Sequence, residues 1–269
     1  MAHRGEHPDE RPREGRRQPA LIARETRAGP YADPVNQVDP EALRTANSFV
    51  ASRFPAADGV VLAGSTASGT STPTSDLDLL LLGPEQMFDD GRSSLATTHE
   101  HEGRLVEVFA YTPTSYRGWA EREISSFRPV ILVMLRDGVV LRESVVLTEL
   151  RDWATTVLAA GPSIDQHALD VRRYMVSALL DDLADSIEPD ERAFVLGEAY
   201  RALVELLLLA HGRWLGSGKW LVRRLREWDV VVAGRLGEAL ATGDVDAFVS
   251  YADELMTPLG GRLQAGMVR

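Results

Sequence analysis

The chain has 269 residues, of which 44% are hydrophobic and 26% charged, with a formal net charge of −11 at pH 7 and no cysteine. This composition is typical of a soluble globular protein with one large domain or two modest ones, and it excludes disulfides and thiolate metal sites, which fits a cytoplasmic protein. The acidic balance argues against a nucleic-acid partner, and no apolar run reaches the roughly 18 residues that a membrane span needs.

Residues 1–36 are predicted to form a disordered tail. They are rich in proline, glycine and charged residues and have almost no apolar periodicity. The start of the chain is polar and arginine-rich without an apolar stretch, so it does not indicate a secretory signal.

A mixed α+β domain is predicted over residues 37–145. Asp39 is suited to cap a helix that ends near Phe54, because Pro40 and an acidic residue follow it in the first turn. Residues 59–83 then predict two apolar strands joined by a segment of Gly, Ser, Thr, Ala and Pro. The first strand ends at Gly64-Ser65, and the second carries Asp76 and Asp78.

Asp76 and Asp78 are expected to point to the same side of their strand, because side chains alternate between faces. Two carboxylates about 7 Å apart form half of a divalent cation site, and a cation relieves their mutual repulsion. Gly64 allows close approach of the backbone to a ligand, and Ser65 with the following amides can donate to phosphate oxygens. The alternative is an ordinary hairpin with two exposed aspartates.

A third strand is predicted at residues 104–111, after a polar stretch that shows no strand pattern. Glu107 lies among apolar neighbours in this strand, where a charge must be exposed, paired or metal-bound. The alternative is an edge-strand glutamate facing water, and Glu102 is a weaker competitor because it lies in the turn. His99 and His101 are expected to be an exposed loop pair.

These motifs resemble the nucleotidyltransferase superfamily that includes DNA polymerase β. The features shared are a strand ending in Gly64-Ser65, a polar spacer and Asp76-x-Asp78 on the next strand. The resemblance implies that Ser65, with Gly64 and Ser75, binds the triphosphate of a nucleotide, ATP by default, and that Asp76 and Asp78 hold Mg²⁺. The segment LVEVFAY is similar to the corresponding strand of aminoglycoside adenylyltransferases, which implies that Glu107 is the third metal carboxylate and accepts the proton of the attacking hydroxyl.

Residues 146–269 are predicted to form an all-α helical bundle domain that binds substrate and nucleotide, with the strand at residues 139–142 ending the first domain. The expected helices are 147–159, 167–186, 190–215, 219–228, 230–241 and 245–256, with starts at Ser163, Asp190 and Asp244. Lys219 is the single lysine among 29 basic residues, a skew typical of GC-rich bacterial genomes. It opens a helix after Gly216-Ser217-Gly218, an arrangement suited to a triphosphate. The alternative is a surface lysine.

Glu198, Arg201 and Glu205 form a polar stripe on an otherwise apolar helix, at spacings i, i+3 and i+7. One interpretation is a mutually paired triad facing solvent. The other places Glu198 and Glu205 against the substrate, because some aminoglycoside nucleotidyltransferases take their general base from the helical domain. Glu107 and a bundle glutamate are therefore rival bases.

The sequence thus predicts a Mg²⁺-dependent nucleotidyltransferase that moves AMP from ATP to a hydroxyl of a small molecule, such as an aminoglycoside-like antibiotic. The expected partners are a nucleoside triphosphate and this acceptor, with no nucleic acid and no membrane, in a cytoplasmic monomer or homodimer. Two alternatives stay open. One is an antitoxin-like adenylyltransferase of a protein partner, and the other is an inactive nucleotide-binding module.

Overall fold

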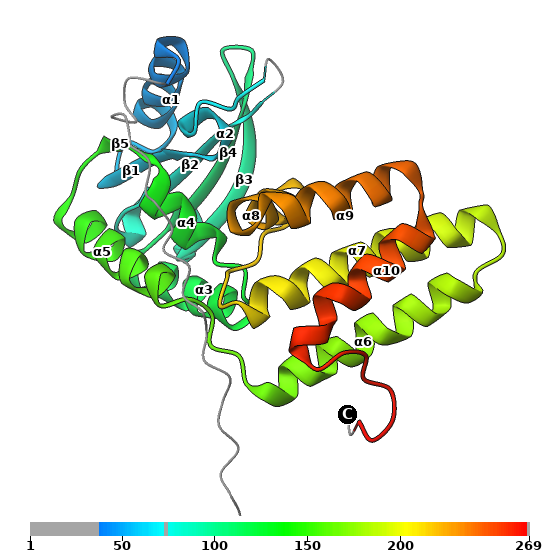
Figure 1. The fold of residues 1–269 in the computed structure, drawn as a ribbon. Coiled ribbons are helices and arrows are strands. Elements are labelled where there is room, and N and C mark those ends of the chain that lie inside the picture. Colours follow the sequence, from blue (N-terminus) through cyan, green and yellow to red (C-terminus); the bar gives the residue numbers. More distant parts are fainter. Residues whose placement is uncertain (1–37, 73–74, 268–269) are drawn as a thin grey trace, which may run out of the picture. The chain divides into compact units, whose positions relative to one another are not determined.

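A five-stranded mixed sheet forms the first half of the fold (Figure 1). The computed structural model describes residues 38–72 and 75–267, so the predicted tail at residues 1–36 lies outside the described residues. The strand order is β3-β4-β2-β1-β5. Its strands are β1 (Gly59–Ala63), β2 (Leu77–Leu82), β3 (Ser94–His101), β4 (Arg104–Tyr111) and β5 (Val139–Arg142).

One strand pair in this sheet is parallel, and that pair matters most for the site. β2 runs antiparallel to β1 but parallel to β4, with Asp78 directly opposite Glu107. The remaining pairs, β1 with β5 and β3 with β4, are antiparallel. Because directly opposed residues on adjacent strands point to the same face, the register places the carboxyl groups of Asp78 and Glu107 side by side.

Each face of the sheet is covered by helices and forms its own core. On one face, Leu77, Leu79 and Leu81 of β2 pack against α1 (Pro40–Arg53). On the other face, Leu80 and Leu82 pack with helices α3 (Pro113–Ser125), α4 (Val130–Asp137) and α5 (Val145–Ala160). Asp78 has the same strand parity as Leu80 and Leu82, so it belongs to the α3–α5 face. The predicted cap of α1 is confirmed, since the Asp39 carboxylate accepts from Glu41 N at 3.0 Å.

The expectation of a loop at His99 and His101 was wrong. Both residues lie in β3, the edge strand that forms an antiparallel hairpin with β4. The His99 ring packs 5.3 Å from the ring of Phe49 and 6.4 Å from that of Phe54. A histidine therefore occupies a position of β3 that a hydrophobic residue normally fills, and this concealed the strand pattern.

The helices that follow α5 pack around α7 (Pro189–Ala210), which is buried along its C-terminal half. Its neighbours in the bundle are α6 (Gln166–Asp185), α8 (Lys219–Trp228), α9 (Val230–Thr242) and α10 (Val245–Met256). The bounds of α8 and α10 are as predicted. α7 ends five residues before the predicted Leu215, and α6 is capped by Asp165 rather than Ser163.

The α+β fold class is therefore confirmed, with a small mixed sheet followed by helices. The described residues belong to one compact unit, and the division at residues 145 and 146 into two domains stays a prediction. In the part of the chain that the structure describes, no helix combines the length and apolarity required to cross a bilayer.

Candidate active site

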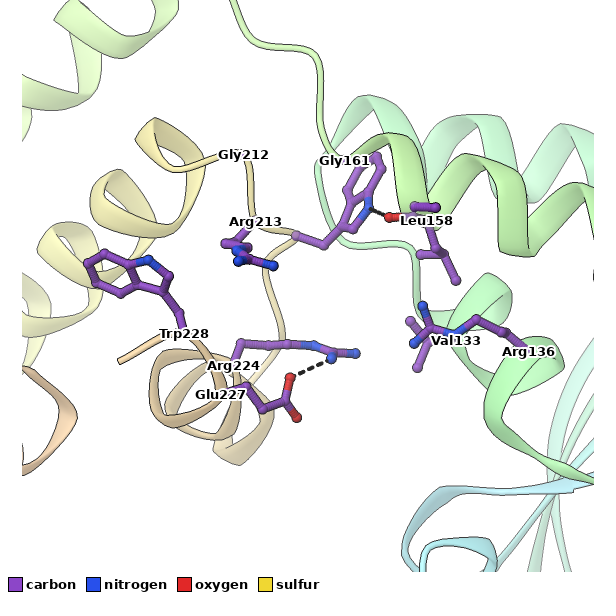
Figure 2. A pocket seen from close by; sticks show the side chains of 11 residues that line it. Val133, Arg136, Leu158, Gly161, Gly212, Arg213, Arg224, Glu227 and Trp228 are labelled. Carbon is purple, nitrogen blue, oxygen red and sulfur yellow. Dashed lines mark hydrogen bonds and ion pairs between the residues drawn. The ribbon is translucent and has the colours of Figure 1, made fainter. Parts of the chain in front are cut away.

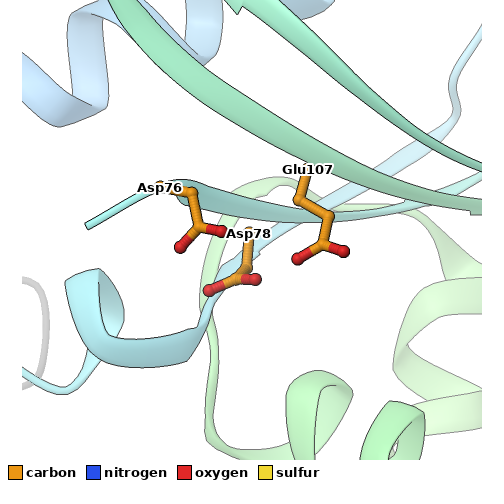
Figure 3. A group of neighbouring side chains, drawn as sticks. All are labelled: Asp76, Asp78 and Glu107. Carbon is orange, nitrogen blue, oxygen red and sulfur yellow. The ribbon is translucent and has the colours of Figure 1, made fainter. Parts of the chain in front are cut away.

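Three carboxylates converge on the α3–α5 face of the sheet (Figure 3). Asp76, Asp78 and Glu107 each bring one carboxylate oxygen within 4.8 Å of the others. Within residues 38–72 and 75–267, no other trio of His, Asp or Glu side chains places its ligand atoms this close. Carboxylate oxygens are the ligands that Mg²⁺ prefers, so the donor chemistry of this carboxylate triad fits a divalent cation.

Strand geometry explains why these three side chains meet. Asp76 precedes β2 by one residue and Asp78 is the second residue of that strand, so their side chains share a face. Glu107 pairs with Asp78 across the β2–β4 ladder. All three are half-buried, so the carboxylates are partly desolvated while a path to solvent remains.

The electrostatics of the triad are unfavourable without a counter-ion. Burial is the largest cause that raises the pKa of Asp78, and together with the charges of Asp76 and Glu107 and a hydrogen bond with Glu107 it brings this pKa to about 7. Lys219 acts in the opposite direction and lowers the pKa of Asp78. A carboxyl group in this state exchanges its proton readily for a divalent cation.

Gly64 lies against the triad at the end of β1. Its φ is +68°, a left-handed value that favours glycine. A Cβ at this position would lie 1.8 Å from Asp78 Oδ2, so any side chain would displace the carboxylate. The sequence predicted that the backbone of Gly64 lies close to a ligand. In the structure, this backbone lies directly against the carboxylate of Asp78.

Ser65 follows in the short helix α2 (Gly64–Ala67) and is buried. The next residue, Thr66, donates from Oγ1 to the carbonyl oxygen of Asp76 at 3.3 Å. This bond ties α2 to the start of β2, so Ser65 and Asp76 are held on adjoining segments. The contribution of Thr66 was not predicted, because one hydroxyl among the many in this segment carries no distinguishing signal.

Ser75 is hydrogen-bonded to Thr72 just before β2 begins. Its hydroxyl accepts from Thr72 N at 2.9 Å, and its own N–H donates to the Thr72 carbonyl at 2.9 Å. These two bonds hold Ser75 against Thr72. The binding of a triphosphate by Ser75 stays a prediction.

Lys219 is the first residue of α8 and is exposed. Gly218, before it, has a φ of +52°. At Gly216 a Cβ would lie 2.6 Å from the carbonyl carbon of Trp220. These glycines allow the tight turn into α8. The ammonium group lies near enough to influence Asp78, so the structure brings this predicted residue toward the triad.

Glu198 and Glu205 are both bound by arginines. The buried Glu205 carboxylate contacts Arg128 at 2.6 Å, Arg172 at 3.3 Å and Arg201 at 3.4 Å. Glu198 is half-exposed and pairs with Arg201 at 2.5 Å, a hydrogen bond that lowers the pKa of Glu198. The stripe is ion-paired, as one interpretation expected, but Glu205 is buried rather than facing solvent. Arg128 and Arg172 are 77 and 33 residues away from Glu205, and no local pattern predicts such pairs.

The family comparison agrees with the geometry of the triad. The family model for the nucleotidyltransferase domain matches residues 43–127, which include the whole carboxylate triad. No curated protein matches the chain. Among solved structures, the nucleotidyltransferase-like protein from Exiguobacterium sibiricum 255-15 is 14% identical, with a TM-score of 0.38 over 81% of this chain and 74% of that one.

The family match, about a third of the chain, agrees with the motifs and the strand geometry. It spans the segment from α1 to the end of α3 and contains Gly64, Ser65 and the three carboxylates. Residues 43–127 of this chain therefore belong to the nucleotidyltransferase superfamily.

Proposed function

We propose that the protein is a Mg²⁺-dependent nucleotidyltransferase that transfers AMP from ATP to a hydroxyl group of a small molecule. The observation that carries this proposal is the convergence of Asp76, Asp78 and Glu107 within 4.8 Å in a domain of this superfamily. Asp76, Asp78 and Glu107 would hold the cation. When bound, Mg²⁺ neutralises charge on the triphosphate and favours ionisation of the acceptor hydroxyl.

The reaction is an in-line displacement at the α-phosphorus. The acceptor oxygen forms a bond to this phosphorus, the bond to the oxygen that bridges the α- and β-phosphorus breaks, and pyrophosphate leaves. Glu107 is proposed to accept the proton of the hydroxyl. It has an advantage over Glu198 and Glu205, because no arginine contact is found for Glu107 among the described residues, whereas both bundle glutamates are ion-paired.

The phosphates are proposed to bind between Ser65 and Lys219. Ser65 lies beside the triad on α2, and the charge of Lys219 acts on Asp78. An ammonium group at this place would bind the triphosphate as a point charge. Gly64 would keep Asp78 in position, since no side chain separates the backbone from its carboxylate.

The acceptor class is tested with ATP labelled at the α-phosphate, because the β- and γ-phosphates leave as pyrophosphate. The purified protein is incubated with Mg²⁺ and a panel of aminoglycosides and sugars, and separately with cell lysate. A labelled small molecule that disappears in Asp76→Asn supports the proposal. A labelled protein band instead indicates a protein-modifying enzyme, and no labelled product in either arm indicates an inactive nucleotide-binding module.

The supporting argument against an inactive module is that all three carboxylates are present and meet. Without a cation, this cluster costs free energy, as the raised pKa of Asp78 indicates. A cytoplasmic location completes the proposal, because a chain without cysteine is suited to a reducing compartment.

A further inference from the structure

A cavity of about 200 Å³ lies at the C-terminal end of α8, apart from the carboxylate triad (Figure 2). Its walls come from α4, the end of α5, residues 212–214 and α8. Helix α8 runs from Lys219, whose charge acts on the carboxylate triad, to Trp228, which lines the cavity. The α8 residues that line the cavity begin at Arg224, about 7.5 Å along the helix from Lys219, and no residue of the carboxylate triad lines it.

The charged lining is mostly positive, although the whole chain carries a net charge of −11. Arg136, Arg213 and Arg224 line the cavity, and Glu227 is its one acidic residue. Figure 2 shows Arg136 and Arg224 extending toward each other across the space, with Arg213 on the same side as Arg224. Guanidinium groups that share one small space repel each other wherever carboxylates do not compensate their charge.

Two of the three arginines have a local carboxylate and the third has none. Arg136 pairs with Asp137 at 2.5 Å and Arg224 with Glu227 at 2.8 Å. For the exposed Arg213, no side-chain ion pair is found with any residue that the structure describes. The guanidinium group of Arg213 therefore supplies the uncompensated charge of the cavity.

The walls are held in place by contacts between segments far apart in the sequence. Trp214 donates from Nε1 to the Leu158 carbonyl at 3.0 Å. A Cβ added at Gly161 would lie 2.8 Å from the Gly212 carbonyl oxygen, so the end of α5 touches the segment that carries Arg213. Trp228 packs against His211 in a tilted arrangement, with ring centroids 4.5 Å apart. The cavity is thus a fixed recess with an aromatic wall.

Size and charge together select the ligand. Sites for drug-sized ligands occupy about 300–1,000 Å³, so a cavity of about 200 Å³ is too small for a nucleotide or an aminoglycoside. Guanidinium groups bind phosphate and carboxylate groups through paired hydrogen bonds. We propose that this cavity is a second ligand site, which binds a small polyvalent oxyanion through Arg136, Arg213 and Arg224.

The test is a calorimetric titration of the full chain in EDTA with inorganic pyrophosphate and, in a second arm, with citrate. The absence of divalent cations prevents metal-mediated binding at the carboxylate triad. Binding is expected in at least one arm, to weaken about tenfold or more in Arg213→Gln and in Arg224→Gln, and to weaken with added salt. The arm with the tighter binding identifies phosphate or carboxylate as the preferred group.

Arg235→Gln is the matched control, because Arg235 is an exposed arginine of α9 that pairs with Glu254 and does not line the cavity. It is expected to bind like the unmodified protein. Trp228→Phe adds a second measurement, in which the ligand-induced change in tryptophan fluorescence decreases while the calorimetric affinity is retained.

The site is independent of the proposed transferase function, and Asp78→Asn separates the two. This variant is expected to lose nucleotidyl transfer and to keep the oxyanion affinity. The inference is overturned if neither anion binds at millimolar concentration, if Arg213→Gln and Arg224→Gln bind as tightly as the control, or if Asp78→Asn abolishes binding.

Discussion

Gly64 is placed directly against the carboxylate of Asp78, so that a Cβ on Gly64 would lie 1.8 Å from Asp78 Oδ2. Gly64→Ala is therefore expected to push this carboxylate out of the triad. The backbone adds a cost of about 1 kcal/mol, because φ is +68°. We expect nucleotidyl transfer to fall by at least about 100-fold, which the α-labelled ATP assay measures.

Gly103→Ala is the matched control for this variant. Gly103 has a φ of +74°, but a Cβ there meets nothing within 4 Å. It therefore carries the same backbone strain without the contact with a carboxylate. Equal losses of activity in the two variants would show that backbone strain, and not displacement of the Asp78 carboxylate, causes the loss in Gly64→Ala.

Glu205 is predicted to stabilise the fold and to take no part in the proton transfer. Glu205→Gln removes the charge that joins Arg128, Arg172 and Arg201, and should lower the free energy of unfolding by about 2 kcal/mol. Glu107→Gln should lower kcat by about 100-fold or more. Chemical denaturation and kcat, measured where both variants are folded, separate these roles.

Glu198→Gln completes this comparison, because Glu198 is half-exposed and its pair with Arg201 should contribute less than about 1 kcal/mol. A large fall of kcat in Glu205→Gln, with Glu107→Gln active, would assign the general base to the bundle.

Glu123 gives the fold a pH dependence of its own. Its Oε2 accepts from Ile131 N at 2.8 Å, and burial raises the pKa of Glu123 to about 7 from an ordinary value of 4.5. Between these values the folded state binds more protons than the unfolded state, so the free energy of unfolding falls as the pH rises from about 4.5 to about 7. Glu123→Gln keeps an oxygen acceptor and should remove roughly 2 kcal/mol of this dependence.

Denaturation of both proteins at pH 5 and pH 8 measures this difference, with the exposed Glu121→Gln on the same helix as control. Glu123→Gln should have a higher free energy of unfolding than the unmodified protein at pH 8, and the difference should be small at pH 5. A difference that is the same at both pH values would mean that Glu123 is ionised throughout.

The carboxylate positions were accessible to sequence reasoning because they depend on local rules. Asp76 and Asp78 share a face by strand alternation, although Asp76 lies just before β2. The N-termini of α1 and α10 were also predictable, because the carboxylates of Asp39 and Asp244 each accept a hydrogen bond in the first turn. Local rules do not predict the pairing of Asp78 with Glu107, because it depends on the parallel register of β2 and β4.

Features that depend on distant contacts were missed. β3 was not recognised because His99 fills an apolar position between Phe49 and Phe54. The predicted helix at residues 190–215 ran too far, since Gly212 has a φ of +65° and Arg213 N donates back to the Leu208 carbonyl. The cavity at the end of α8 is built from four separate segments, so no single stretch of sequence indicates it.

The most direct test of the central claim is a calorimetric titration of the nucleotide-free protein with Mn²⁺ as a probe for Mg²⁺. Because the pKa of Asp78 is raised to about 7, its proton competes with the cation. The affinity should therefore rise about tenfold per pH unit up to about pH 7 and level off above it. Asp78→Asn and Glu107→Gln should bind at least about tenfold more weakly at pH 8. Equal affinities in all three proteins, without pH dependence, would contradict a metal site at Asp76, Asp78 and Glu107.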